Sequence, residues 1–281
     1  MKQQRIAMPT CRYGYVHTQH NDSIMAPRTA IMTCFDSGNR IFAVYLHSIC
    51  IISEQEELHS ALEIQTKQTI MTPTEIRNEL LAQRLIKNLN RRNMDAYYCP
   101  TANDAIDKVT ELLPKGATVS WGGSMTIRDM GLTKRLHETG LYTLLDRDLA
   151  KDRDEAQEIY LNAFRADFYI SGINAISEDG VIVNIDGNGN RVAAITFGPK
   201  HVIFVAGINK VTQNVEAALA RARSTAAPIN TARFDIKTPC KADGVCHNCN
   251  STDCICNHIH FLRNSPRRRH TVVIVGENLG Y

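Results

Sequence analysis

Residues 168–206, FYISGINAISEDGVIVNIDGNGNRVAAITFGPKHVIFVA, decide the fold class of this chain. They contain four apolar runs, at residues 168–171, 181–185, 192–197 and 201–206. Each run has the length of a strand and is bounded by glycine or polar residues. The second and third runs are joined by Asp-Gly-Asn-Gly-Asn, which is typical of a hairpin loop. The stretch therefore predicts four strands, with one antiparallel pair among them.

Helices alternate with strands on both sides of this stretch. Thr72 can cap a first helix, with Pro73 in its first position and Glu75 completing a capping box. Its buried face is expected to carry five apolar residues, Ile76, Leu80, Leu81, Leu85 and Leu89. Asn103 is expected to cap the second helix. Further helices are expected at residues 125–139, 152–165 and 215–224, and further strands at residues 95–99, 118–121, 142–145 and 271–275.

This order predicts an α/β fold with a mixed sheet covered by helices, over residues 71–281. Residues 1–70 differ, because their histidines and cysteines are scattered and no helical or strand period appears. We expect this segment to be poorly ordered, or to lie upstream of a true start at Met71. An accessory domain is the alternative, and an intact mass that includes Met1 would contradict the late start.

Composition excludes several classes of protein. The chain has 281 residues, of which 43% are hydrophobic and 22% charged, as in a globular protein rather than a disordered one. A net charge of +3 is too small to indicate nucleic-acid binding. No apolar stretch reaches the roughly 18 residues of a membrane span, and no secretory signal is visible. We therefore expect a cytoplasmic protein without a membrane span or a nucleic-acid partner.

Five of the nine cysteines crowd into one segment, at positions 240, 246, 249, 254 and 256. Clustered thiols in a reducing compartment hold metal more often than they form disulfides. The Cys246-x-x-Cys249 pair lets both sulfurs reach one centre from a tight turn, and thiolates suit zinc or an iron–sulfur cluster. Cys254 and Cys256 would point opposite ways in an extended chain, so we expect one of them at the centre. Free thiols, or a redox-active pair, on a flexible loop are the alternative.

Three glycine-containing loops are candidates for binding an anion. Gly122, Gly123 and Ser124 precede Thr126 between a strand and a helix, where glycines admit a ligand and backbone N–H groups are free. The other two loops each carry a lysine after a predicted strand, where open α/β sheets bind ligands. Their candidate residues are Gly198, Lys200, Asn209 and Lys210. Convergence of the three loops at one sheet edge would make a site for a small anionic metabolite.

Glu178 is the candidate catalytic residue. It lies with Asp179 in a loop between two predicted strands, where a carboxylate can act as a base or as a nucleophile toward an acyl group. A turn with exposed acids is the alternative, and it suits Asp179 better than Glu178.

Taken together, these motifs resemble the signature of the LUD-domain (lactate-utilisation) family. The similar segments are YISGINAISEDG at residues 169–180, IDGNG at 185–189, FGPKH at 197–201 and GINK at 207–210. The Gly122-Gly123-Ser124 turn resembles an upstream glycine loop of that family. The cysteine segment and the final VGENLGY are similar to a subgroup with a C-terminal cysteine motif. We include Asn174, in the first segment, among the ligand-binding candidates.

The resemblance implies a fold similar to that of ribose-phosphate isomerase, glucosamine-phosphate deaminase and CoA transferases. It also implies a link to oxidation of L-lactate to pyruvate, with iron–sulfur partner proteins. The subgroup's recurring cysteines correspond to Cys240, Cys246, Cys249 and Cys256. Residues 177–180 also resemble the glutamate loop of CoA transferases, although Asp179 replaces an asparagine.

Three functions are therefore compatible with the sequence. The first is a component of lactate or related organic-acid metabolism. The second is an acyl- or CoA-transferring enzyme with Glu178 as its nucleophile. The third is a non-catalytic, metal-dependent sensor of a ligand.

Overall fold

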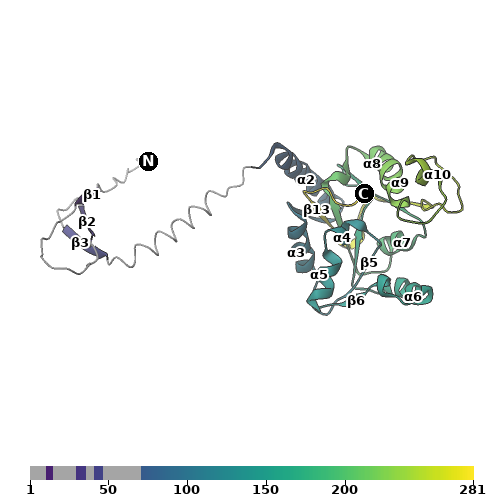
Figure 1. Ribbon diagram of the computed structural model, residues 1–281, viewed down its shortest axis with the longest axis horizontal. Helices are drawn as coiled ribbons and strands as arrows, with labels where there is room; N and C mark the ends of the chain where they lie inside the picture. Colours follow the sequence, from purple (N-terminus) through teal and green to yellow (C-terminus); the bar gives the residue numbers. More distant parts are fainter. Residues whose placement is uncertain (1–10, 15–29, 36–40, 47–70) are drawn as a thin grey trace, which may run out of the picture. The chain divides into compact units, whose positions relative to one another are not determined.

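The computed structural model describes residues 11–14, 30–35, 41–46 and 71–281 (Figure 1). The chain divides into two units, Met1–Ile70 and Met71–Tyr281. In the first unit, three strands form an antiparallel sheet in chain order, β1 (Cys11–Gly14), β2 (Ala30–Phe35) and β3 (Ile41–Leu46). The sequence did not predict these strands. The hypotheses on disorder and on a late start concern residues 1–70, of which all but these three strands lie outside the described ranges.

The second unit is an α/β domain built on a six-stranded sheet whose neighbouring strands are all parallel. The strand order is β4 (Asp95–Cys99), β13 (His270–Val275), β10 (His201–Gly207), β7 (Phe168–Gly172), β5 (Thr118–Trp121) and β6 (Thr143–Leu145). The predicted strands at these positions are confirmed, with shifts of a residue or two at the ends.

Helices cover both faces of this sheet, which is why its central strands are continuously apolar. In β10, Phe204 belongs to the core under α2 (Pro73–Arg91), α6 (Arg153–Ala163) and α7 (Asn190–Thr196). Its neighbour Val205 belongs to the opposite core, under α3 (Ala102–Leu112), α4 (Met125–Asp129) and α5 (Leu132–Thr139). No helix among the described residues is long and apolar enough to cross a membrane.

A smaller, mixed sheet contains the antiparallel strands. Its order is β11 (Val211–Thr212), β8 (Ala175–Ser177), β9 (Ile182–Asp186) and β12 (His258–Leu262), with β9 antiparallel to both of its neighbours. Helix α8 (Val215–Arg221) packs on this sheet and continues through Ala222–Ala226 into α9 (Ala227–Thr231).

The strand predicted at residues 192–197 is wrong, because this run forms α7. Gly189, with φ at +83°, reverses the chain after β9. The Asp186 carboxylate then accepts the backbone N–H groups of Gly189 and Val192, at 3.0 and 3.2 Å. The Asp-Gly-Asn-Gly-Asn segment therefore starts a helix instead of closing a hairpin.

Three helix predictions also need correction. The capping box of Thr72 and Glu75 is confirmed, but Ile76 and Leu80 are 47% and 67% exposed, because the buried stripe of α2 runs through Ala82, Leu85 and Leu89. Helix α3 is capped by Thr101 rather than by Asn103. The helix expected at residues 125–139 is broken into α4 and α5 at Gly131, whose φ is +85°.

Candidate functional site

Two of the predicted anion loops meet at the carboxyl edge of the large sheet. The turn after β5 carries Gly123, Ser124 and Thr126, and the segment after β10 carries Lys210; all four line one cavity of about 480 Å³. Asn174, which follows β7, also lines it. We call this cavity the ligand cavity. Its position agrees with the rule that open α/β sheets bind ligands beyond the carboxyl ends of their strands.

Lys210 is the most deeply buried of the basic residues in the ligand cavity, at 3% exposure. Its Nζ donates to the Thr126 hydroxyl at 2.7 Å and to the Ile173 carbonyl at 3.0 Å. Burial, together with the nearby positive charges of Arg221 and Arg191, lowers the pKa of Lys210 to about 7. No carboxylate pairs with Lys210 within the described part of the chain.

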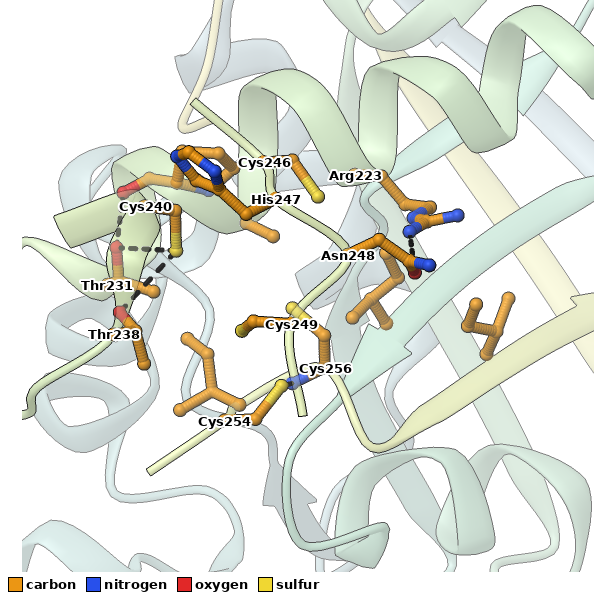
Figure 2. Close-up of a pocket in the computed structure, with 15 residues that line it drawn as sticks. Arg223, Thr231, Thr238, Cys240, Cys246, His247, Asn248, Cys249, Cys254 and Cys256 are labelled. Carbon is orange, nitrogen blue, oxygen red and sulfur yellow. Dashed lines mark hydrogen bonds between the residues drawn. The ribbon is translucent and has the colours of Figure 1, made fainter. Parts of the chain in front are cut away.

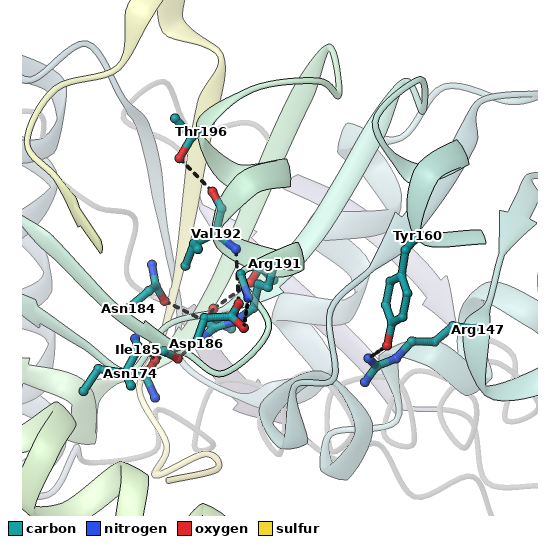
Figure 3. Close-up of polar contacts among 12 residues, drawn as sticks. Arg147, Tyr160, Asn174, Asn184, Ile185, Asp186, Arg191, Val192 and Thr196 are labelled. Carbon is teal, nitrogen blue, oxygen red and sulfur yellow. Dashed lines mark hydrogen bonds and ion pairs between the residues drawn. The ribbon is translucent and has the colours of Figure 1, made fainter. Parts of the chain in front are cut away.

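Arg191 has a structural role in the wall of the ligand cavity (Figure 3). Its guanidinium donates to Asn184 Oδ1 at 2.8 Å, Asn174 Oδ1 at 3.1 Å and the Ile185 carbonyl at 2.6 Å. Its Nε lies 3.6 Å from the Asp186 carboxylate. Because these partners use most of its donors, Arg191 holds the loops after β7 and β9 together and neutralises Asp186.

Two other arginines in the ligand cavity have donors left for a ligand. Arg147 donates to the Tyr160 hydroxyl and crosses Gly123 so closely that a Cβ there would collide with its guanidinium. Arg233, just beyond α9, donates to Asn230 Oδ1 at 3.0 Å and lies over the Phe234 ring. A guanidinium can bind a carboxylate with two parallel hydrogen bonds. The ligand cavity is therefore suited to an anion.

All five clustered cysteines line a second, smaller cavity of about 110 Å³, which we call the thiol cavity (Figure 2). Cys240 lies in α10 (Pro239–Asp243), and its sulfur lies 3.8 Å from the Thr231 hydroxyl of α9. The Cys254 sulfur accepts the Cys256 N–H at 3.3 Å. Burial, and then the neighbouring thiols, raise the pKa of Cys256 to about 12.

The thiols surround the thiol cavity instead of converging on a point. Among the side chains that the structure describes, no three histidine, cysteine or acidic groups are close enough to share one metal ion. His247 lines the cavity, but its ring bonds to Asp243 at 2.7 Å. Ile185 and Ile255 line both cavities, so the two sites share a wall.

Comparison with known proteins identifies the domain. The family model of the LUD domain matches residues 82–275. The chain belongs to the LUD-domain family. No curated protein is significantly similar to it in sequence.

Among solved structures, the LUD domain is similar to a DUF162 family protein from Deinococcus radiodurans, with 14% identity and a TM-score of 0.44 over 70% of this chain and 98% of that one. It is also similar to ribose 5-phosphate isomerase from Plasmodium falciparum, with 16% identity and a TM-score of 0.28 over 40% and 52% of the two chains. Translation initiation factor eIF-2B from Pyrococcus horikoshii matches with 14% identity and a TM-score of 0.29, over 41% and 49%.

Four of the predicted ligand-binding residues of the LUD domain do not line the ligand cavity. Gly122 lies directly before it, and the Asn209 side chain accepts the Leu279 N–H at 3.2 Å. Gly198 and Lys200 lie before β10, at the opposite edge of the sheet, because the run that precedes them is helix α7. Lys200 is 70% exposed there and pairs with Asp167 at 2.7 Å.

Glu178 lies in the turn between β8 and β9 and lines neither the ligand cavity nor the thiol cavity. Its carboxylate pairs with Arg84 of α2 at 3.2 Å, and its carbonyl accepts from Asn88 at 2.8 Å. These contacts join the turn to α2.

Sequence reasoning missed Arg147, Arg191 and Arg233. Arg147 follows the strand predicted at residues 142–145, so the strand-end rule that selected the lysines also applied to it. Arg191 was assigned to the loop before a strand that proved to be a helix. Arg233 carried no signal, because it reaches the ligand cavity from the end of α9, far from the sheet motifs in sequence.

Proposed function

We propose that this LUD domain binds a small organic acid of the lactate and pyruvate class in the ligand cavity and supports the use of such acids. The observation that carries the proposal is the unbalanced charge of the cavity lining. Lys210, Arg147 and Arg233 all line it, whereas Asp186, the acidic side chain in the same lining, is paired with Arg191. Arg147 has a carboxylate outside the lining, that of Asp148 at 3.7 Å, which Arg128 shares. The family resemblance, with its link to lactate oxidation, supports this class of ligand.

The size and polarity of the ligand cavity support a hydrated, polar ligand. Its volume of about 480 Å³ exceeds what a three-carbon acid fills, so larger 2-hydroxy acids belong among the candidates. Arginine forks and a buried ammonium select carboxylates over neutral molecules, because the charged acceptor strengthens each hydrogen bond.

Ligand-linked stabilisation tests this proposal. We expect L-lactate, pyruvate or a longer homologue to raise the free energy of unfolding by about 2.7 kcal/mol at a hundred times its Kd. In Arg233→Met, at least ten times more ligand should be needed for the same stabilisation. Lys200→Met is the matched control, since Lys200 lies at the opposite edge of the sheet. A protein that no acid of the series stabilises would contradict the proposal.

We also propose that the thiol cavity holds a metal centre, with Cys240, Cys246, Cys249 and Cys256 as its ligands. The chemistry of the donor set fits, since soft thiols line one small space. Metal binding would have to draw the sulfurs together, because no three of the described donors meet at one point in this structure. Four sulfurs on one zinc ion lie within about 4 Å of each other, whereas a four-iron cluster binds each thiolate through a different iron. Zinc would supply a structural clamp, and an iron–sulfur cluster would supply electron transfer, to which an iron–sulfur partner protein would be suited.

Metal analysis of anaerobically purified protein tests the centre. We expect the protein to contain stoichiometric zinc, or iron with sulfide. The Cys249→Ser variant should lose this metal, and the Cys254→Ser variant should retain it. Both substitutions remove one thiol from the same loop, so Cys254→Ser controls for general damage. Metal-free protein with every thiol titratable would contradict the centre.

A metal-dependent ligand sensor is the second candidate, and the shared wall of Ile185 and Ile255 favours it. It predicts that removing metal weakens acid binding although no turnover occurs. Acyl transfer through Glu178 is not proposed, since that carboxylate pairs with Arg84 outside the cavities.

A further inference from the structure

We propose that the Lys210 amine reacts with the carbonyl carbon of a 2-oxo acid in the ligand cavity and forms an imine. The inference rests on the proposed function, because it takes the same cavity and the same class of acid. It adds a covalent step, and with it a distinction between two kinds of acid. A 2-oxo acid such as pyruvate would form a covalent bond to Lys210. A 2-hydroxy acid such as lactate, which has no ketone carbon to attack, would bind only non-covalently.

The contacts of Lys210 leave its amine suited to attack. Its Nζ has two hydrogen-bond acceptors, the Thr126 hydroxyl at 2.7 Å and the Ile173 carbonyl at 3.0 Å. A neutral amine has two hydrogens and one lone pair. When both hydrogens are donated to these acceptors, the lone pair stays free to attack a ligand. Lys210 lines the ligand cavity, where that ligand would bind.

The surroundings of Lys210 favour its neutral form, which is the nucleophile. The side chain is 3% exposed, and the positive charges of Arg221 and Arg191 act on it. Desolvation is the larger cause and the two arginines add to it, so the pKa falls to about 7. A large fraction of the amine is therefore unprotonated at neutral pH. Lys200, 70% exposed and paired with Asp167, lacks these features.

The cavity also has groups for the other end of the acid. Arg147 and Arg233 line it and can bind the carboxylate next to the reacting carbonyl. Binding that carboxylate would hold the carbonyl near the amine and remove the entropy cost of a bimolecular encounter.

The reaction balances without an oxidant or a metal. The Nζ lone pair forms a C–N bond as the carbonyl π bond breaks, and a proton moves from nitrogen to the former carbonyl oxygen. The resulting carbinolamine then loses that oxygen as water and becomes the imine. The Thr126 hydroxyl, 2.7 Å from Nζ, is positioned to relay these protons.

Reductive trapping tests the inference on the full-length, metal-loaded protein. The protein is incubated with pyruvate and sodium cyanoborohydride, and lysine adducts are mapped by peptide mass spectrometry. We expect a stable secondary amine at Lys210 well before any at Lys200, and none with lactate. Thr126→Ala should slow trapping by roughly tenfold or more at saturating pyruvate, because it removes the proton relay.

Three outcomes separate this inference from the proposed function. If lactate and pyruvate both stabilise the protein but Lys210 is modified no faster than Lys200, the imine is overturned and the proposed function stands. If Lys210 is trapped although lactate gives no stabilisation, the imine is supported and lactate is removed from the ligand class. If neither acid binds and no adduct forms, both are overturned.

Discussion

Replacing Lys210 with methionine should stabilise the protein by an amount that depends on pH. Lys210 is almost fully buried, and its pKa falls from 10.5 to about 7 in the folded protein. Each pKa unit corresponds to about 1.4 kcal/mol, so keeping a protonatable amine at this position costs the folded state about 5 kcal/mol below pH 7. Methionine has a similar length and no charge, so it removes this cost.

The sign of the pH dependence follows from proton counting. Between pH 7 and 10.5 the unfolded chain holds the Lys210 proton and the folded protein releases it, so wild-type stability rises with pH. The methionine variant lacks this contribution. Its advantage over wild type should therefore be largest at pH 7 and below, and it should shrink by about 2 kcal/mol between pH 7 and pH 9. Loss of the hydrogen bonds to Thr126 and Ile173 subtracts an amount that does not change with pH.

Urea unfolding of both proteins at pH 7, 8 and 9, purified in the same way and at one ionic strength, measures this difference. Lys200→Met is the control, because that lysine is exposed and its effect should stay constant over this range. Stability curves of Lys210→Met and wild type that run parallel from pH 7 to 9 would refute the reasoning. They would show that Lys210 stays charged when buried.

Two further predictions concern the frame around the ligand cavity. Asp186→Ala should lower the free energy of unfolding by about 3–5 kcal/mol, because it leaves the Arg191 charge without its carboxylate. The control is Asp235→Ala, at a fully exposed position, and equal effects from the two changes would contradict this prediction. Thr72→Ala should cost about 1 kcal/mol in urea unfolding by removing the cap of α2, while Thr74→Ala, inside the same helix, should cost less.

Local patterns in the sequence were enough to predict most strands of the large sheet. Parallel strands buried on both faces are short apolar runs, and β7, β10 and β13 are recognisable as such without any partner. A capping box needs only residues three apart, so Thr72 and Glu75 were identifiable. The cysteines of the thiol cavity are likewise close in sequence, which is why their grouping could be predicted.

Other elements were not determined by the apolar pattern alone. The run at residues 192–197 is apolar and suits either a strand or a helix, and the Asp186 carboxylate decides for the helix by accepting the N–H groups at its start. Strands β8, β11 and β12 are short, and they become a sheet only through pairing with segments elsewhere in the chain. Sequence pattern cannot supply such pairings.

Part of the candidate site could likewise be predicted from local sequence, and part depended on the tertiary structure. The sequence by itself determined which segments could carry an anion site, since glycines at strand ends and lysines beside them are local features. Only the tertiary structure decided that Lys210 is buried in a cavity with Arg147 and Arg233, that Lys200 lies at the other edge of the sheet, and that Glu178 pairs with Arg84. Burial and ion pairing are properties of neighbours brought together by folding, and they set the charge and reactivity of each group.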